Sequence, residues 1–225
     1  MGTGIWDFLE FLSIINDINE EFVLNGMEKK YISFDIEAAG PTPGKYSMLS
    51  LGACVVGDTA TRFYREIKPI SREFVLEAMR VSARGLRCLD GFRCREEYHF
   101  GSDKFNPGKV LDVLEEIGSE PRVVMKEYAE WVRDVTKGFR PIEAAAPIKF
   151  DGAFTSWYFD NFYDLENPFG HSGEDINSLY RGVTGDVNSH IVQLGFRPNG
   201  LPHNALEDAI IQAKEMEAVL ELMGV

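Results

Sequence analysis

The sequence predicts an α/β fold with a mixed sheet that starts as antiparallel strands. Strand-like segments come first in the chain, and helices that alternate with one more strand follow them. The 225 residues are 44% hydrophobic, which is sufficient for one large domain with a single core. We expect that domain to span residues 27–225, and we interpret residues 1–26 as an N-terminal amphipathic helical extension.

Strands are predicted where apolar residues alternate with others or form short runs, at residues 31–35, 48–56, 62–67 and 146–150. The Gly-Pro-Thr-Pro-Gly sequence at residues 40–44 supplies the turn between the first two strands. The last of the strands, Ala-Pro-Ile-Lys-Phe, is predicted to be buried and to end at Asp151.

Helices are predicted where apolar residues recur at helical spacing, at residues 5–22, 121–137, 155–163 and 205–223. Pro121 opens the second of these helices, because a proline is tolerated in the first helical turn. We expect the remaining long segment, residues 71–120, to be irregular with short helices.

The charge of the chain is acidic and uneven. A net charge of −13 disfavours tight binding to long duplex nucleic acid, since neutralisation of phosphates dominates that affinity. Residues 60–109 nevertheless hold 11 Lys and Arg residues against 7 Asp and Glu residues. This segment is either a solvated surface with ordinary mixing of charges or a flap that faces phosphate groups.

The composition favours a reduced compartment. Three cysteines argue against a disulfide framework, and no run approaches the ~20 apolar residues of a membrane span. Asp7 and Glu10 interrupt the apolar N-terminal run, and no basic residue precedes Lys29, so the pattern is not that of a signal peptide. We predict a cytoplasmic protein without a membrane partner.

Two carboxylates stand at the end of the first predicted strand. Because Ile32, Phe34 and Ile36 alternate with other residues, Asp35 and Glu37 are expected to point to one opposite face. Like charges at this spacing repel each other unless a counter-ion holds them. The pair is either a solvated strand face or part of a metal site.

His203 and Asp208 stand at the start of the last helix. Asn204 and Glu207 have the spacing of a capping box, which places the N-cap at Asn204 and leaves His203 outside the helix. Asp208 then lies in or just beyond the first turn, where the helix dipole favours its ionised form. The two side chains can therefore converge on one point. Taken singly, His203 could be a loop histidine bonded to a carbonyl, and Asp208 could merely decorate the helix start.

The order Asp35-x-Glu37, Asp151 and His203-x(4)-Asp208 resembles that of the DEDDh 3′–5′ exonucleases, the group of ribonuclease T, oligoribonuclease and polymerase proofreading subunits. Residues 30–222 share the resemblance, and the stretches GPTPGKYSMLSLGACVV, FYREIKPIS, ENPFGHSGEDINSLY and HNALEDAIIQA are similar to a bacterial subgroup. It implies a ribonuclease-H-like fold with a five-stranded mixed sheet flanked by α-helices. It also implies an enzyme that hydrolyses phosphodiester bonds at the 3′ end of short oligonucleotides or 3′ tails.

The sequence departs from the family pattern at two places. Ala38 and Ala39 stand where many members have two Thr residues, so a hydroxyl contact to the terminal nucleotide is absent and backbone contacts are left to substitute. Asp151 lies in IKFDGAF, without the His-Asn contribution of the usual second motif. Asp160 and Asp164 are alternatives for this position, and Asp151 is preferred because it ends the predicted strand.

The resemblance implies two Mg²⁺ or Mn²⁺ ions in each active site. Asp35 would bridge both ions, and Asp151 would hold the ion on the side of the leaving group. Glu37 and Asp208 would complete the site of the other ion. His203 would take a proton from the attacking water as general base.

Substrate contacts are predicted at Ala38, Met48, Leu49 and Phe154. Met48 and Leu49 would line the nucleotide slot, and Phe154 would stack on a terminal base, with core packing as the alternative for this aromatic helix. The implied partner is single-stranded nucleic acid, RNA or DNA. Members of the group commonly dimerise, so a homodimer is also predicted, with residues 5–22 as a candidate interface.

Two other functions are compatible with this sequence. One is a non-catalytic nucleic-acid-binding module on the same fold, which would be marked by loss of a carboxylate or of the histidine, and all of these residues are present. The other is a related metal phosphohydrolase of small nucleotide esters. Turnover of a mononucleotide analogue combined with poor binding of oligonucleotides would favour the second alternative.

Overall fold

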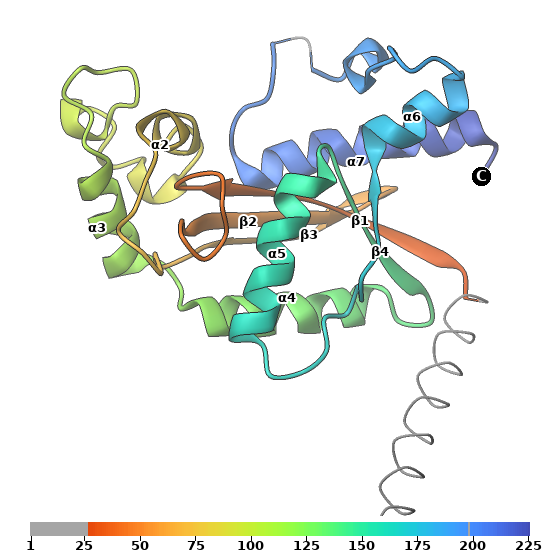
Figure 1. The fold of residues 1–225 in the computed structure, drawn as a ribbon, viewed down its shortest axis with the longest axis horizontal. Helices are drawn as coiled ribbons and strands as arrows, with labels where there is room; N and C mark the ends of the chain where they lie inside the picture. The colour runs from red at the N-terminus through yellow and green to blue at the C-terminus, as the bar shows by residue number, and fades with distance from the viewer. Residues whose placement is uncertain (1–26, 198) are drawn as a thin grey trace, which may run out of the picture.

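The computed structural model describes residues 27–197 and 199–225, which contain one sheet flanked by helices (Figure 1). The strands are β1 (Lys29–Ala38), β2 (Met48–Val55), β3 (Asp58–Glu66), β4 (Arg140–Ala145) and β5 (Gly173–Asp175). Their order in the sheet is β3-β2-β1-β4-β5, antiparallel from β3 to β1 and parallel from β1 to β5. The five-stranded mixed sheet is thereby confirmed, whereas the predicted extension lies outside the described residues.

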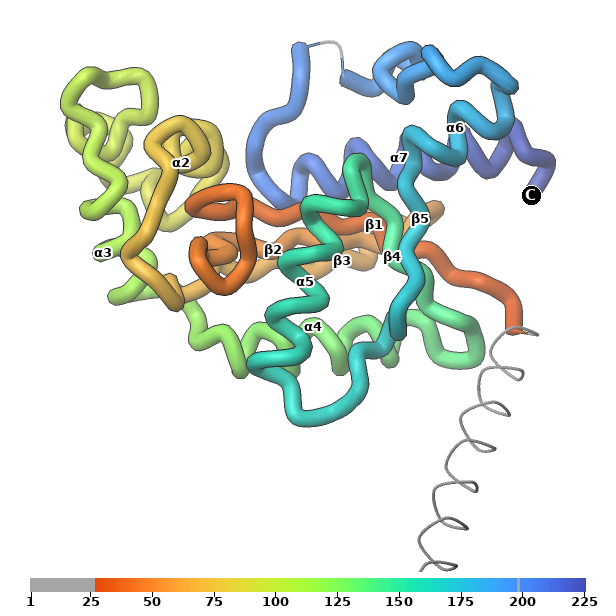
Figure 2. Tube along the Cα trace, in the orientation of Figure 1, coloured from red at the N-terminus to blue at the C-terminus, as the bar shows by residue number. Residues whose placement is uncertain are grey.

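The α-helices are α2 (Leu76–Ser82), α3 (Pro107–Ile117), α4 (Pro121–Val135), α5 (Ile148–Phe162), α6 (Ile176–Thr184) and α7 (Ala205–Met223). Short 3₁₀ turns occur at η1 (Arg87–Leu89), η2 (Glu96–Tyr98) and η3 (Ile191–Leu194). The trace in Figure 2 shows α7 along one side of the sheet, α4 on the other side, and α2 and α3 together at one end. None of the described helices is long and apolar enough to cross a membrane.

Strand β1 separates two different layers. Ile32, Phe34 and Ile36 are buried in an apolar cluster with residues of α4 and α5. On the opposite face, the Ser33 hydroxyl donates a hydrogen bond of 2.8 Å to the Ala209 carbonyl of α7. The predicted alternation along this strand is confirmed, and the polar face is the one that α7 covers.

The N-terminal end of α7 lies directly on β2. A Cβ atom at Gly52 would be 2.2 Å from the Leu206 backbone nitrogen, which is far inside van der Waals contact. Only glycine permits this approach of helix to strand. The first turn of α7 is therefore brought close to the neighbouring strand β1, where Asp35 is paired with Gly52 in the sheet register.

The predicted strand at residues 146–150 is wrong, because β4 ends at Ala145 and α5 begins at Ile148. Asp151 therefore lies in the first turn of α5 and does not end a strand. A short apolar run does not distinguish a buried strand from a buried helical segment by periodicity alone. Pro147, which is at the N-cap of α5, marks the helix start that the sequence interpretation placed at residue 155.

Other elements match the predictions more closely. The helices expected at residues 121–137 and 205–223 are confirmed as α4 and α7. The segment 71–120 contains short helices as expected, although α3 is longer than a single turn and is capped by the Asn106 side chain. The sequence analysis did not identify β5 or α6, which are only 3 and 9 residues long.

Candidate active site

Asp35 and Glu37 are held on the face of β1 that lies against α7. Asp35 is half-buried, and its Oδ1 atom accepts a hydrogen bond of 2.9 Å from Gln212 Nε2 of α7. Glu37 is only 6% exposed. Ionised side chains are seldom buried without a partner. The negative charges of Asp35 and Glu37 therefore require compensation by a group outside β1.

Asp151 joins these carboxylates from α5. Its Oδ1 atom accepts a hydrogen bond of 3.2 Å from the Ile36 backbone N–H, which lies between Asp35 and Glu37 in the chain. The pairing of β1 with β4 ends at Ser33, so this N–H lies beyond the parallel ladder. Asp151, in the first turn of α5, thus accepts the hydrogen bond that a strand partner would otherwise accept from Ile36. It is the third carboxylate beside β1, after Asp35 and Glu37.

The start of α7 supplies the histidine and the last carboxylate. Asn204 is the N-cap, as predicted, and its Oδ1 atom accepts a hydrogen bond from Glu207 N. His203 precedes the helix in a left-handed conformation with φ of 59°. Asp208 is in the first turn and is 1% exposed, and its Oδ1 atom has no hydrogen-bond partner among the described residues.

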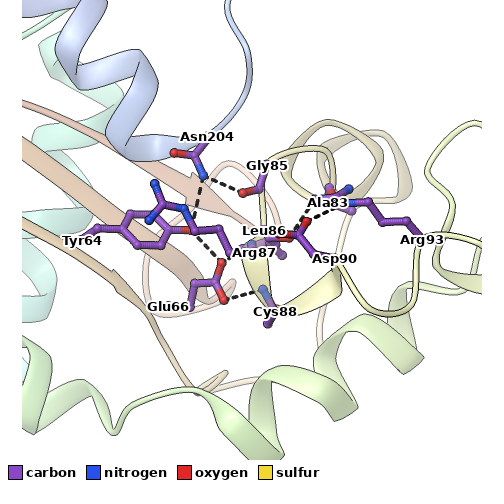
Figure 3. A network of polar contacts seen from close by, with 10 residues as sticks. All are labelled: Tyr64, Glu66, Ala83, Gly85, Leu86, Arg87, Cys88, Asp90, Arg93 and Asn204. Carbon is purple, nitrogen blue, oxygen red and sulfur yellow. Dashed lines mark hydrogen bonds and ion pairs between the residues drawn. The ribbon is translucent and has the colours of Figure 1, made fainter.

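A polar network fixes the loop that carries His203 (Figure 3). Asn204 Nδ2 donates to the Gly85 carbonyl at 2.6 Å and reaches the Tyr64 hydroxyl at 3.5 Å. A Cβ atom at Gly85 would be 1.9 Å from the His203 carbonyl oxygen, so the two backbones are in direct contact. The Asn204 amide therefore fixes the loop to β3 and to the segment after α2, while its carbonyl oxygen caps α7.

Glu66 of β3 holds the other side of the same network. Its carboxylate accepts hydrogen bonds from the Tyr64 hydroxyl and from the backbone N–H groups of Arg87 and Cys88. Figure 3 shows these contacts joining β3 to η1, below the start of α7. The segment that contacts His203 is therefore itself attached to the sheet.

Glu37, His203 and Asp208 form a group that could hold a metal ion. One ligand atom of each residue lies within 4.8 Å of the others. Carboxylate oxygens and an imidazole nitrogen are common metal ligands, and oxygen ligands suit Mg²⁺ and Mn²⁺ in particular. The unpartnered Asp208 Oδ1 atom supports this interpretation, because a buried carboxylate oxygen without a hydrogen bond is costly unless a cation binds it.

The electrostatics of the carboxylates show the same need for a cation. Burial raises the pKa of Glu37 to about 8, and it raises the pKa of Asp151 and of Asp208 to about 7. The pKa of Asp35 is well above its ordinary value, first through burial and then through the charges of the neighbouring carboxylates. A divalent cation would reverse these effects by favouring the ionised forms.

The pKa of His203 is shifted in the opposite direction. Burial and then the positive charge of Arg84 lower it below the ordinary value of histidine. The imidazole is consequently neutral at pH 7 and able to accept a proton.

A cavity of about 460 Å³ opens beside Glu37. Its wall is mainly apolar and comes from the end of β1, the turn after it, α2 and the start of α5. The lining residues are Ile36, Glu37, Ala38, Gly40, Pro41, Val75, Glu77, Ala78, Val81, Ser82 and Phe150. The volume lies within the range of small-ligand sites, roughly 300–1,000 Å³.

Comparison with known proteins decides the family. No protein-family model matches the chain. The chain is 32% identical over 190 residues to the 3′–5′ DNA exonuclease Cap18 of Escherichia coli, and the match covers 82% of this chain and 88% of that protein. This chain belongs to the DEDDh 3′–5′ exonucleases.

Solved structures agree with the fold of this exonuclease. The nuclease domain of 3′hExo, a DEDDh family member bound to rAMP, superposes with a TM-score of 0.59 at 14% identity, over 85% of this chain and 92% of that domain. Exonuclease I of Escherichia coli, in complex with a dA16 oligonucleotide, superposes with a TM-score of 0.56 at 11% identity, over 86% of this chain and 41% of that protein. These likenesses show that the exonuclease has a ribonuclease-H-like fold.

The predicted substrate contacts of the exonuclease fall into two groups. Ala38 lines the cavity beside Glu37. Met48, Leu49 and Phe154 are fully buried in the apolar core, so they leave no side-chain surface for a nucleotide. The aromatic pattern of the sequence gave base stacking and core packing as alternatives for Phe154, and its burial agrees with core packing. Phe150, one turn earlier on α5 and 36% exposed, presents an aromatic ring to the cavity instead.

Three residues of the exonuclease site were not identified from the sequence. Gln212 bonds to Asp35, and the signal for it was available, because it lies four residues after Asp208 on the same face of α7. Phe150 precedes Asp151 directly, but its exposure depends on the helical geometry of this segment. Arg84 was one of many basic residues in the segment 60–109, and no local pattern distinguishes it from the others.

Proposed function

We propose that this exonuclease removes nucleotides one at a time from the 3′ end of single-stranded DNA and requires two Mg²⁺ or Mn²⁺ ions. Support for DNA comes from the relative Cap18, which is a 3′–5′ DNA exonuclease. RNA is the alternative substrate, because the sequence does not distinguish the two sugars. Single strands are expected, since a 3′ end must leave a duplex to reach carboxylates that are this deeply buried.

The observation that carries the metal requirement is the buried, unpartnered Oδ1 atom of Asp208 within reach of Glu37 and His203. The inclusion of Asp35 and Asp151 in the same site is supported by their hydrogen bonds, since Asp35 accepts one from Gln212 of α7 and Asp151 accepts one from the Ile36 N–H next to Glu37. The residues present therefore fit divalent cations. When bound, such ions would neutralise charge on the phosphate and on the attacking and leaving oxygens.

Each residue then has an assigned role. Asp35 would contribute to holding both ions, Glu37 and Asp208 would complete one ion site, and Asp151 would complete the other. His203 acts as general base, because its lowered pKa keeps the imidazole neutral and the residue is only partly buried, within reach of Glu37 and Asp208. The cavity beside Glu37 takes the sugar and base of the terminal nucleotide, with Ala38 and Phe150 in its wall.

The chemistry is the displacement of one oxygen by another at phosphorus. His203 accepts a proton from water, the water oxygen forms a bond to the phosphorus of the last phosphodiester, and the bond from phosphorus to the 3′ oxygen of the preceding nucleotide breaks. That oxygen receives a proton from solvent. The products are a nucleoside 5′-monophosphate and a strand that is shorter by one nucleotide.

Cleavage of 5′-labelled single-stranded DNA and RNA of matched sequence, in Mg²⁺, Mn²⁺ or EDTA, tests this proposal. We expect a ladder that shortens from the 3′ end with either metal, faster for DNA, and none in EDTA. Asp151→Asn should remove the ladder, whereas the matched control Asp160→Asn should retain it, because Asp160 is exposed on the same helix. Loss of activity in Asp160→Asn alone would overturn the assignment of Asp151, and equal activity in EDTA would overturn the metal requirement.

The oligomeric state and the compartment also stay predictions. We propose that the protein forms a homodimer and that residues 1–26 contribute to its interface. We also propose that it resides in the cytoplasm. Light scattering on the full chain and on a chain without residues 1–26 would test the first part. A full chain with the mass of a monomer would overturn it.

A further inference from the structure

Arg84 is an exposed guanidinium beside the catalytic cluster that the proposed hydrolysis does not use. It lies two residues after Ser82, which lines the cavity, and directly before Gly85, which is in contact with the His203 backbone. Its positive charge lowers the pKa of both Glu37 and His203, so the guanidinium lies close to each of them. Arg84 therefore stands at the rim of the site, on the side of His203.

Arg84 forms no ion pair with an acidic side chain within the part of the chain that the structure describes. Other cations of the same segment do have such partners, since Arg72, Arg93 and Lys109 pair with Asp112, Asp90 and Glu97. What distinguishes Arg84 from the other exposed arginines without an ion pair, such as Arg87 and Arg95, is its position next to the backbone contact of Gly85 with His203. The guanidinium is free to bind a phosphate, for which its planar set of N–H donors is well suited.

An aromatic stack holds Arg84 in place. Its guanidinium carbon lies 5.1 Å from the centre of the Phe100 ring, and the Phe100 ring is stacked on His99 at 5.1 Å and 14°. The Phe100 backbone is itself fixed, because Arg80 donates hydrogen bonds to the carbonyls of Phe100 and Ser102. Guanidinium and aromatic faces together are the surfaces on which nucleic-acid bases stack.

The geometry points to Arg84 and the His99–Phe100 stack as the binding site for the second nucleotide from the 3′ end, with Arg84 on its phosphate and the exposed His99 ring on its base. This inference rests on the proposed function. The cavity beside Glu37 has room for the terminal nucleotide, and the strand must leave it past the cluster. Arg84 provides a cation on that side. A second-nucleotide site should give this acidic protein a preference for oligonucleotides over mononucleotide esters, which can be measured.

The test compares two substrates that share the terminal nucleotide. Thymidine 5′-(p-nitrophenyl phosphate) has an aryl leaving group and no second nucleotide, whereas an oligothymidylate has both. For Arg84→Gln we expect the ratio of kcat/KM for the oligonucleotide to kcat/KM for the ester to fall about tenfold, the scale of one charge-assisted hydrogen bond. Most of this loss should be in KM, and the salt dependence of KM should become shallower. Phe100→Leu, which retains apolar bulk, should lower the same ratio by a smaller factor.

Arg65→Gln is the matched control. Arg65 also lies over an aromatic ring, 5.2 Å from the centre of Phe63, but Phe63 belongs to the apolar cluster on the α4 side of the sheet. This variant should leave the ratio unchanged. An unchanged ratio in Arg84→Gln, or an equal fall in Arg65→Gln, would overturn the inference. Wild-type protein that cleaves neither substrate would instead refute the proposed function, so the two failures are distinguishable.

Discussion

The two faces of β1 differ in what they bury: one buries apolar side chains and the other buries carboxylates. Ile32, Phe34 and Ile36 enter a dry cluster under α4 and α5, where the stability comes from burial of apolar surface. Asp35 and Glu37, which alternate with them, enter a polar layer under α7, where burial of charge is unfavourable. The first face stabilises the fold, and the second holds the carboxylates to which we assign metal binding.

The polar layer is tolerated because almost every group in it has a partner. Ser33 bonds to the Ala209 carbonyl, and Gln212 bonds to Asp35. Among the described residues, the buried side-chain atoms of this layer without a hydrogen-bond partner are Asp208 Oδ1 and Ser50 Oγ, and the carboxylates also repel one another. The comparison shows that the negative charge on this face is not balanced by the protein itself at the position where a cation would bind.

The largest effect is expected for Asp35→Asn on the polar face. Loss of one metal-bridging carboxylate should lower kcat by about 10³-fold or more, since charge stabilisation by a metal is worth several kcal/mol. The fold should survive, because an asparagine oxygen can still accept the hydrogen bond from Gln212. Activity, far-UV circular dichroism and Mn²⁺ binding by calorimetry are the measurements. Full metal affinity in this variant would contradict the assigned role.

His203→Ala should separate metal binding from proton transfer. We expect kcat to fall by about 10²–10⁴-fold, the usual range for a lost general base, while most of the Mn²⁺ affinity is retained. His171→Ala is a control, because that histidine lies in an exposed position before β5. An equal loss of metal affinity in His203→Ala and Asp35→Asn would show that His203 is a metal ligand and not the base.

Phe34→Ala is the corresponding change on the apolar face. The ring is fully buried, so its removal should lower the free energy of unfolding by about 3–5 kcal/mol. Urea denaturation monitored by fluorescence measures this directly. At temperatures where the variant is folded, its kcat should stay within a few fold of wild type. A larger stability loss for Asp35→Asn than for Phe34→Ala would reverse the comparison of the two faces.

Without metal, the pH dependence of the free energy of unfolding depends on the protonation of the buried carboxyl groups on the polar face. Because the folded-state pKa values are about 8 for Glu37 and about 7 for Asp151 and Asp208, against ordinary values of 4.5 and 3.8, the folded chain binds protons that the unfolded chain has released. Stability in EDTA should therefore be greatest at low pH within this range and should fall as the pH rises from about 4 to about 8.

Thermal unfolding at several pH values measures this effect. The Tm of Asp208→Asn in EDTA should fall less steeply than that of wild type, and Mn²⁺ should raise the wild-type Tm more at pH 8 than at pH 5.5. Parallel Tm curves for the two proteins would show that Asp208 does not contribute.

The smallest stability effect is expected for Asn204→Ala, which removes the cap of α7. The free energy of unfolding should fall by about 1 kcal/mol. Asn106→Ala is a matched control, because Asn106 caps α3 by the same side-chain contact to the N3 position. Only Asn204→Ala should also lower kcat, since its amide fixes the His203 loop to Gly85. Equal activities in the two variants would show that the network in Figure 3 serves the fold alone.

The sequence alone determined the elements that local chemistry specifies. Alternation along β1 predicted which residues face the core, and the spacing of Asn204 and Glu207 predicted where α7 begins. These features depend on residues a few positions apart, so a single segment contains all the information. The order of the acidic residues and of His203 also predicted the family, because it resembles that of the DEDDh exonucleases.

Only the tertiary structure decided how the distant segments meet. Asp151 contacts Ile36 across 115 residues of chain, and Asn204 contacts Gly85 across 119. The tertiary structure also placed Asp151 in a helix instead of after a strand, buried Phe154, and brought Arg84 beside His203. These outcomes depend on which surfaces pack together. That choice is made by the summed burial of many side chains, and no single stretch of sequence contains it.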